Sequence, residues 1–407
     1  MDILIEELQE NIWALALDNG RIDGLEIDPH NEEVRYGSIY WAKVARIDAG
    51  LDAAFLDLDG DNTGILYNRD VRYHDANGIL HKGGDKQIGK VLHPGDYVAV
   101  QAKSAYIAQY DGDIWRREDK TPQMSMDISI SGRYLIYCPL MQKNQLSQRI
   151  RGTNLRTQME DMMDSLDDMA GFILRSAAAD MQTDILQREG KILKEIWNEI
   201  SAYLQGDSPI LVALGPDSIQ RILGDHAMAP IDRIEIVTMD HFSQVEDWCS
   251  IFAPDLVTKI TPVEMESATQ DLALFEHRDL LGQMETLFHE YAILPHGGNI
   301  IIQPTAALTA IDINKGSDKR SHLSVNIEAA KEITRQIRVR NIGGIITTDF
   351  LKMNKADEKR FLKTLDDLTF TDPCTVQIHG FTKLGLLEIT RKRRTPSLNE
   401  RFVGFEF

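Results

Sequence analysis

Short apolar runs separated by turn residues fill the N-terminal third of the chain. Within residues 1–34, the runs ILIEEL, IWALALD and IDGLEID predict strands, and DNG at 18–20 predicts a hairpin turn. Residues 35–125 continue with short strands such as AAFLDL and TGILY, which flank a turn at 59–62. Many short strands in one compact segment are typical of a small barrel.

The spacing of apolar residues changes after Asn144 and becomes helical. Five apolar residues at helical intervals predict a core-facing helix, which we favour over a methionine metal site: Met159, Met162, Met163, Leu166 and Met169. GFILRSAAAD then predicts a strand, and KILKEIWNEISAYL predicts a long helix.

Strands and helices alternate from residue 208 onwards. PILVAL and IDRIEIVTM predict strands in a segment over 208–285. From residue 286 the apolar strands GGNIIIQPTAALTAIDINKG and GGIITTDF flank an amphipathic helix. A chain of 407 residues with this order predicts a mixed α+β and α/β protein of several domains.

Composition adds three constraints. No stretch reaches the ~18 consecutive apolar residues of a membrane span, and the acidic N-terminus does not resemble a signal peptide. Three dispersed cysteines without a CxxC pair indicate a reducing compartment, so we expect a cytoplasmic protein. With 44 basic and 63 acidic residues, the net charge of −19 requires any nucleic-acid site to be a local cluster of basic residues.

Two strands of the last segment end in acids. Asp312 and Asn314 are two positions apart, so their side chains share one face of a strand, and Asp349 ends another strand. If these strands are neighbours, two carboxylates meet and need a cation between them; hard oxygen ligands suit Mg²⁺, with Mn²⁺ as the alternative. Read from spacing alone, solvated loop acids remain the competing interpretation.

Basic residues flank both aspartates. Lys331, Arg335 and Arg338 form a stripe on the intervening helix, which is either an RNA-facing surface or a solvated face balanced by Glu328 and Glu332. A second concentration follows near the C-terminus: Lys383, Arg391, Lys392, Arg393 and Arg394. Together they predict the local basic groove that so acidic a chain requires.

The segments GGNIIIQPTAALTAIDINKG, NIEAAKEITRQIRVRNIGGIITTDFLKM and GFTKLGLLEITRKRRTPSL resemble the catalytic region of the ribonuclease E/G family. The resemblance extends from the N-terminus to about Leu398. It implies a Mg²⁺-dependent endoribonuclease that cuts single-stranded RNA and leaves 5′-phosphate ends. Asp312 and Asp349 resemble the metal-binding catalytic aspartates, and Asn314 resembles the asparagine that helps to orient the attacking water or a carboxylate.

The same resemblance implies an architecture of four parts. These are an RNase H-like subdomain at 1–34 and 208–285, an inserted S1-type OB fold at 35–125, a 5′-sensor at 126–207 and a DNase I-like catalytic domain at 286–407.

It also implies RNA-binding residues. Phe55 matches an aromatic that stacks on a base, and a core phenylalanine is the alternative. Ile65 stands where a second aromatic is frequent, and Tyr67 on the same strand face could replace it. The remaining RNA-binding residues are basic: Lys120, Lys383, which stands where arginine is common, and Arg391.

Arg175 and Ser176 resemble the Arg-Thr pair of the family's 5′-monophosphate sensor, with an ordinary ion pair as the alternative. The family continues into a cysteine-rich zinc link, whose cysteines this sequence lacks. We therefore expect no zinc, and a homo-oligomer would have to form without that link.

Three functions compete at this point. The first is an active metal-dependent endoribonuclease, because Asp312, Asn314 and Asp349 are all present. The second is an RNA-binding or assembly protein of the same fold with weakened catalysis, and the third is a phosphodiesterase acting on DNA or a small nucleotide. Incubation with matched RNA and DNA, with and without Mg²⁺, distinguishes them.

Overall fold

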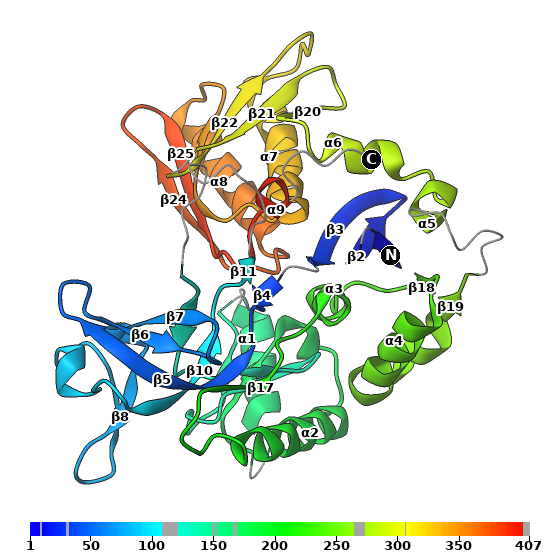
Figure 1. Ribbon diagram of the computed structural model, residues 1–407. Helices are drawn as coiled ribbons and strands as arrows, with labels where there is room; N and C mark the ends of the chain where they lie inside the picture. The colour runs from blue at the N-terminus through cyan, green and yellow to red at the C-terminus, as the bar shows by residue number, and fades with distance from the viewer. Residues whose placement is uncertain are drawn as a thin grey trace. The chain divides into compact units, whose positions relative to one another are not determined.

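The computed structural model describes all 407 residues except 9, 30–31, 108–120, 149, 151–152, 165, 167–168, 264–272, 306 and 402–407. The chain divides into two compact units (Figure 1). The first unit comprises Met1–Pro29, Ala229–Asp247 and Asp255–Phe407, and the second comprises His30–Met228 and Trp248–Pro254. Within the described residues, no helix combines the length and the apolar character needed to cross a bilayer.

One sheet of the first unit is built on the N-terminal strands. Its order is β19-β18-β1-β2-β3. The bounds are β1 (Asp2–Leu8), β2 (Asn11–Asp18), β3 (Arg21–Asp28), β18 (Arg233–Ile236) and β19 (Ile260–Pro262). The three N-terminal strands are those that the apolar runs predict. Short helices α5 (Ala273–His277) and α6 (Leu281–Thr286) contribute side chains to the same core.

The second sheet of the first unit contains both aspartate strands. Its order is β20-β21-β22-β23-β25-β24, in which only β22 and β23 are parallel neighbours. The bounds are β20 (Tyr291–Ile293), β21 (Asn299–Pro304), β22 (Thr309–Asn314), β23 (Gly344–Asp349), β24 (Val376–Phe381) and β25 (Leu386–Arg391).

Two helices cover one face of this sheet. Helix α7 (His322–Val339) starts after Ser321, whose side chain accepts a hydrogen bond from the backbone N–H of Ser324. It ends before Asn341, which has a left-handed φ of 50° that asparagine tolerates. Helix α8 (Lys355–Thr369) is capped by Asn354, and α9 (Leu398–Arg401) closes the described chain. Apolar residues of α7, α8 and alternate strand positions form one core, which leaves the opposite sheet face open.

The second unit contains the expected barrel. Strands β5, β6, β7, β12 and β10 pair in succession, and β10 pairs back to β5, so five strands close an OB-like barrel. The bounds are β5 (Ile39–Asp48), β6 (Ala53–Asp57), β7 (Thr63–Tyr67), β10 (Tyr97–Ala102) and β12 (Gln123–Ser125). Two small pairings accompany it, β8 (Arg72–His74) with β9 (Leu80–Lys82) and β4 (Glu32–Val34) with β11 (Tyr106–Ile107).

A smaller α/β part completes the second unit. Its sheet order is β13-β14-β16-β15. The bounds are β13 (Ile130–Ser131), β14 (Leu135–Tyr137), β15 (Gln145–Leu146), β16 (Phe172–Leu174), α1 (Thr153–Asp164), α2 (Thr183–Ser201) and α3 (Ser218–Asp225). Met159 of α1 is fully buried in the core of this part, as its helical spacing predicts.

One strand lies elsewhere than its segment suggests. β17 (Ile210–Ala213), expected with residues 208–285, pairs with β5 of the barrel. Helix α4 (Met239–Phe252) follows β18 in the chain. The finer division into four named subdomains remains a prediction, whereas a mixed α/β chain with a closed OB-like barrel is what the structure contains.

Candidate active site

Asp312 and Asp349 are direct partners across the parallel pair β22–β23. Their neighbours Ile311, Ile313 and Thr348 are buried, so period-two alternation turns both carboxylates to the open face of the sheet. Adjacent strands lie about 4.8 Å apart, so the two acids face solvent side by side. The expected proximity of the two strands is confirmed.

Asn314 lies on the same face, two residues beyond Asp312. Its side-chain Nδ2 donates to Oδ2 of Asp312 at 3.2 Å and to Oδ1 of Asn299 at 3.2 Å. This hydrogen bond orients the Asp312 carboxylate and leaves its Oδ1 available to a ligand. The amide therefore couples β21, β22 and the candidate site.

A buried asparagine holds the chain just after Asp349. Asn326 of α7 is fully buried, its side-chain N–H donates to the Leu351 carbonyl at 2.7 Å, and its Oδ1 accepts from the Leu351 N–H at 3.1 Å. This pair of bonds ties the exit of β23 to the helix on the far face of the sheet. Sequence reasoning missed Asn326, although a polar amide among the apolar positions of a helix is a signal for such a contact.

The model of the ribonuclease E/G family matches residues 129–394, which is well over half of the chain. The chain belongs to the ribonuclease E/G family.

Named relatives agree with this assignment over nearly the full chain. Ribonuclease E of Haemophilus influenzae is 30% identical over 98% of this chain and 42% of that protein, and ribonuclease E of Escherichia coli K12 is 30% identical over 96% and 37%. Ribonuclease G of Escherichia coli K12 is 27% identical over 98% of this chain and 81% of that protein. The chain thus spans less than half the length of these two ribonuclease E relatives.

The helix between the aspartates does not present the expected basic groove. Arg335 donates to the Ile22 carbonyl and pairs with Glu332 at 2.7 Å, and Arg338 pairs with Asp23 at 2.5 Å. These arginines fasten α7 to β3, and α7 lies on the face of the sheet opposite the aspartates. Arg335 and Arg338 therefore do not form a free basic groove beside the aspartates.

Arg391 also differs from its expected role. Its side chain is 1% exposed, its Nε lies 3.0 Å from the Asp372 carboxylate, and Nη1 donates to the Ile342 carbonyl. A guanidinium enclosed in this way has no surface to offer a phosphate. In this member of the ribonuclease E/G family we therefore assign Arg391 to the core rather than to RNA.

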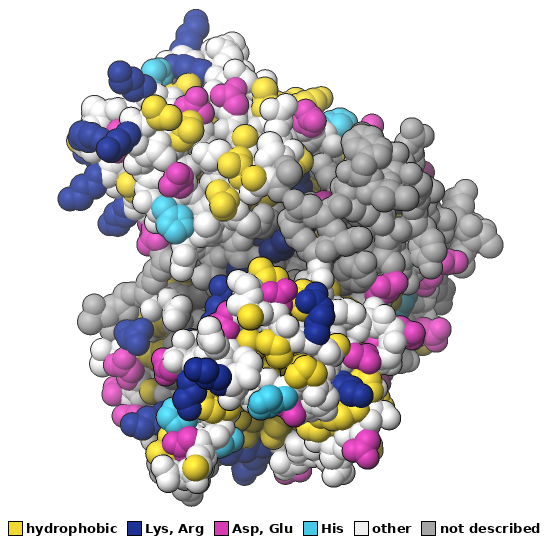
Figure 2. All heavy atoms as spheres, turned by 60° about the vertical axis from the view of Figure 1, so that its left-hand side comes forward, with side chains coloured by type: hydrophobic (Ala, Val, Ile, Leu, Met, Phe, Trp, Pro, Cys, Tyr) yellow, Lys and Arg dark blue, Asp and Glu magenta, His cyan; other side chains and the backbone are white. Residues whose placement is uncertain are grey.

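Four lysines that follow strands of this sheet are exposed. Lys319, Lys352 and Lys355 follow β22 or β23 in the chain, and Lys383 lies in the turn between β24 and β25. Figure 2 shows Lys and Arg side chains gathered along the upper left margin of the face that it draws. Lys120 lies outside the described residues.

Phe55 lies on the outside of the barrel. Its ring is partly exposed, whereas its neighbours Ala54 and Leu56 are fully buried in the barrel core. The guanidinium of Arg46 lies 3.6 Å from the ring centroid, and Ile65 is its cross-strand partner. The partly exposed ring argues against the core alternative for Phe55, and a role as a stacking surface remains a prediction.

Tyr67 has a similar arrangement. The Arg69 guanidinium lies 5.2 Å from its ring centroid, and strand register places Tyr67 on the same barrel face as Phe55. Ile65, between them, is 7% exposed. The barrel surface therefore combines two aromatic rings with two arginines.

Arg175 and Ser176 follow β16. Arg175 donates from Nη1 to the Gly132 carbonyl and from Nη2 to the Gly224 carbonyl, both at 2.8 Å, and Ser176 is 9% exposed. Burial raises the pKa of nearby Glu189 to about 6, and the charge of Arg175 opposes that rise. Two N–H groups of the Arg175 guanidinium are thus engaged with backbone carbonyls, and its charge acts on Glu189, so the ion-pair alternative stays open. The 5′-phosphate role remains a prediction.

Replacing Arg391 with alanine should lower the free energy of unfolding by about 3–5 kcal/mol, because it leaves the buried Asp372 carboxylate without its partner. Urea denaturation followed by circular dichroism measures this. Lys383→Ala, at an exposed turn, is the matched control and should change stability by at most about 0.5 kcal/mol. An unchanged unfolding midpoint for Arg391→Ala, together with weaker RNA binding, would show that Arg391 binds RNA instead of stabilising the core.

Phe55→Ala should weaken binding of single-stranded RNA by about 1–3 kcal/mol, the loss of one base–aromatic stack. Fluorescence anisotropy measures the affinity, and Phe55→Tyr, which keeps a ring, should bind as the wild type does. Thermal melting accompanies both variants. Unchanged affinity with a strongly lowered melting temperature would show that the ring serves folding instead.

Proposed function

We propose that this chain is a divalent-metal-dependent endoribonuclease that cuts single-stranded RNA and leaves 5′-phosphate ends, acting in RNA processing or decay in the cytoplasm. The observation that carries the proposal is the register pairing of Asp312 with Asp349 on an open sheet face, in a chain of the ribonuclease E/G family. The names of its relatives support RNA as the substrate.

The donor set fits Mg²⁺, with Mn²⁺ as the alternative. Among the described residues, no group of three or more His, Cys, Asp or Glu could hold a metal. The candidate ligands are the two carboxylates of the register pair Asp312–Asp349. Mg²⁺ is commonly held by one or two carboxylates and completes its shell with water and substrate phosphate. When bound, a divalent cation would supply Lewis acidity toward the phosphodiester.

The chain's own residues prepare that site. Asn314 orients the Asp312 carboxylate through its N–H, and Asn326 fixes the backbone that follows Asp349. Both contacts restrict the carboxylates before a substrate arrives, which reduces the cost of organising them during the reaction.

The barrel supports a polymeric substrate. Its surface presents Phe55 under Arg46 and Tyr67 near Arg69, a pairing of rings and positive charge that suits unpaired bases and their phosphates. The proposed preference for a 5′-monophosphate rests on Arg175 and Ser176. Equal cleavage of RNAs that end in a 5′-monophosphate and a 5′-hydroxyl would remove it.

Asp312→Asn and Asp349→Asn should each reduce RNA cleavage by at least about a hundredfold, because even outer-shell changes at metal sites cost 10–100-fold. RNA affinity, measured separately by anisotropy, should persist, since stacking and basic groups lie elsewhere. Asp367→Asn, on the exposed side of α8, is the control acid and should cut normally.

Two results would contradict the proposal. Full turnover in either aspartate variant would remove the metal-site assignment. Tight RNA binding by the wild type without cleavage in Mg²⁺ or Mn²⁺ would favour an RNA-binding protein of the same fold.

A further inference from the structure

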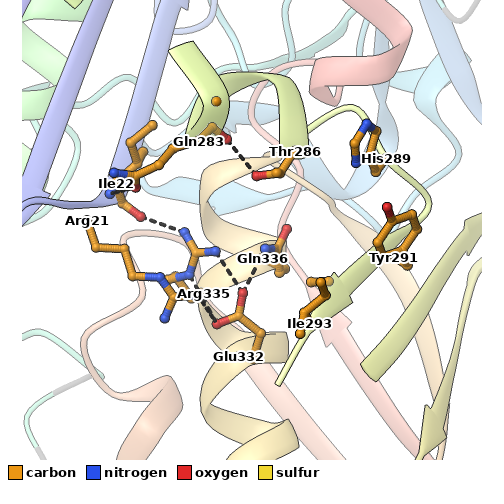
Figure 3. A pocket seen from close by; sticks show the side chains of 12 residues that line it. Arg21, Ile22, Gln283, Thr286, His289, Tyr291, Ile293, Glu332, Arg335 and Gln336 are labelled. Carbon is orange, nitrogen blue, oxygen red and sulfur yellow. Dashed lines mark hydrogen bonds and ion pairs between the residues drawn. The ribbon is translucent and has the colours of Figure 1, made fainter. Parts of the chain in front are cut away.

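A cavity of about 500 Å³ lies within the first unit, at the outer edge of the sheet that carries the aspartates (Figure 3). Its walls come from β3, α6, α7 and β20, four elements far apart in the sequence. The residues that matter below are Arg21, His289, Tyr291, Ile293 and Glu332. The mechanism proposed above uses none of them.

One wall of the cavity is aromatic and apolar. The rings of His289 and Tyr291 stack with centroids 5.3 Å apart and an interplanar angle of 20°. Tyr291 is 47% exposed and Ile293 is 70% exposed, so the edge strand β20 presents two large side chains to solvent. Figure 3 shows His289, Tyr291 and Ile293 along the same side of the cavity. A flat, solvated ring beside an isoleucine is a surface on which a planar base can stack.

The opposite wall is charged and already organised. The Glu332 carboxylate accepts from Arg21 at 2.8 Å, from Arg335 at 2.7 Å and from Gln336 at 2.8 Å. Burial alone would raise the pKa of Glu332, but the bonds from Arg335 and its charge outweigh burial and leave that pKa lowered. The carboxylate is therefore ionised at neutral pH and holds both arginines in place.

Arg21 uses only part of its guanidinium for hydrogen bonds within the described residues. Its side chain is 53% exposed and uses Nη2 for Glu332, and within the described residues no other partner accepts from its guanidinium. The remaining N–H groups can reach oxygen or nitrogen acceptors on a base or a phosphate. This gives the cavity a positive, hydrogen-bonding side that favours a nucleotide over an apolar protein segment.

The aromatic wall is anchored. Arg340, which is 3% exposed, donates to the backbone carbonyls of His289 and Thr286. These bonds hold the chain that leads into β20 against the end of α7. A platform fixed in this way costs little ordering on binding.

Strand register aligns the platform with the carboxylates. Tyr291 is paired with Ile301, Ile301 with Asp312, and Asp312 with Asp349. Paired residues point to the same side of a sheet, so these four form one row across it. Two strand spacings of about 4.8 Å put the Tyr291 backbone about 10 Å from that of Asp312.

We propose that the Tyr291 cavity is a subsite for one unpaired base of the RNA substrate, reached from the scissile phosphodiester around the edge strand β20, where Tyr291 shares the row of Asp312 and α7 forms the far wall. The base stacks on Tyr291 and His289, and Arg21 donates to its edge or to the adjoining phosphate. This inference rests on the proposed function, because it assumes that the cleaved bond lies at Asp312 and Asp349.

The test is a double-mutant cycle between protein and RNA, measured by anisotropy in EDTA so that binding is separated from cleavage. A series of single-stranded RNAs carries one abasic nucleotide at successive positions. Tyr291→Ala should bind intact RNA about 5- to 150-fold more weakly, as expected for one lost stack. At one position, loss of the base should weaken binding to the wild type by a similar factor. The same abasic RNA should bind Tyr291→Ala about as tightly as intact RNA binds that variant.

Two controls accompany the cycle. Tyr291→Phe keeps the ring and should behave as the wild type does. Tyr203→Ala removes a tyrosine that is 70% exposed in the other unit and should leave RNA affinity unchanged. Thermal melting of each variant shows that the fold is intact.

Separate outcomes decide the two proposals. Affinity of Tyr291→Ala within about twofold of wild type, or equal abasic losses in both proteins, would overturn the subsite and leave this surface to a protein partner. If the wild type cuts RNA but the effects of Tyr291→Ala and of the abasic nucleotide are independent at every position, the proposed function stands and the subsite fails. If coupling is present and the wild type does not cut, the subsite stands and the proposed function fails.

Discussion

The parallel pairing of β22 with β23 is the constraint on which the candidate site depends. Only this register sets Asp312 opposite Asp349, and a slip by one residue would turn one carboxylate into the core. Parallel neighbours need a crossover, and α7 supplies it on the buried face. Because the helix occupies that face, the carboxylates are left on the open one.

The same crossover explains where the basic residues are used. Arg335 and Arg338 tie α7 to β3, and Arg340 ties its end to the segment before β20. Arg391 neutralises Asp372 inside the core. In a chain with a net charge of −19, these arginines serve the fold, and the proposals assign nucleic-acid contacts to other basic groups: Arg21, exposed lysines and the arginines over the barrel aromatics.

Local patterns could predict the strands and the strand-end position of each acid, whereas the meeting of the two acids depends on the pairing of β22 with β23. The two-residue period places Asp312 and Asn314 on one face of their strand, and the apolar run before Asp349 marks the strand that ends there. Met159 likewise follows from helical spacing.

The predictions that differ from the structure, and the features that sequence did not predict, share one cause. A stripe of arginines reveals the polarity of a helix face but not the element that covers it, and Asp23 lies 315 residues from Arg338. The pairing of β17 with the barrel and the cavity around Tyr291 also join distant segments. Such contacts are fixed by tertiary packing, which single-sequence periodicity does not contain.

Direct measurement of metal binding tests the central claim, that the paired carboxylates form a cation site. Electron paramagnetic resonance of free Mn²⁺ titrated with protein reports binding without any turnover. We expect wild type and Asp367→Asn to bind alike, and Asp312→Asn and Asp349→Asn to lose at least about tenfold in affinity. Equal Mn²⁺ binding by all four proteins would contradict the account.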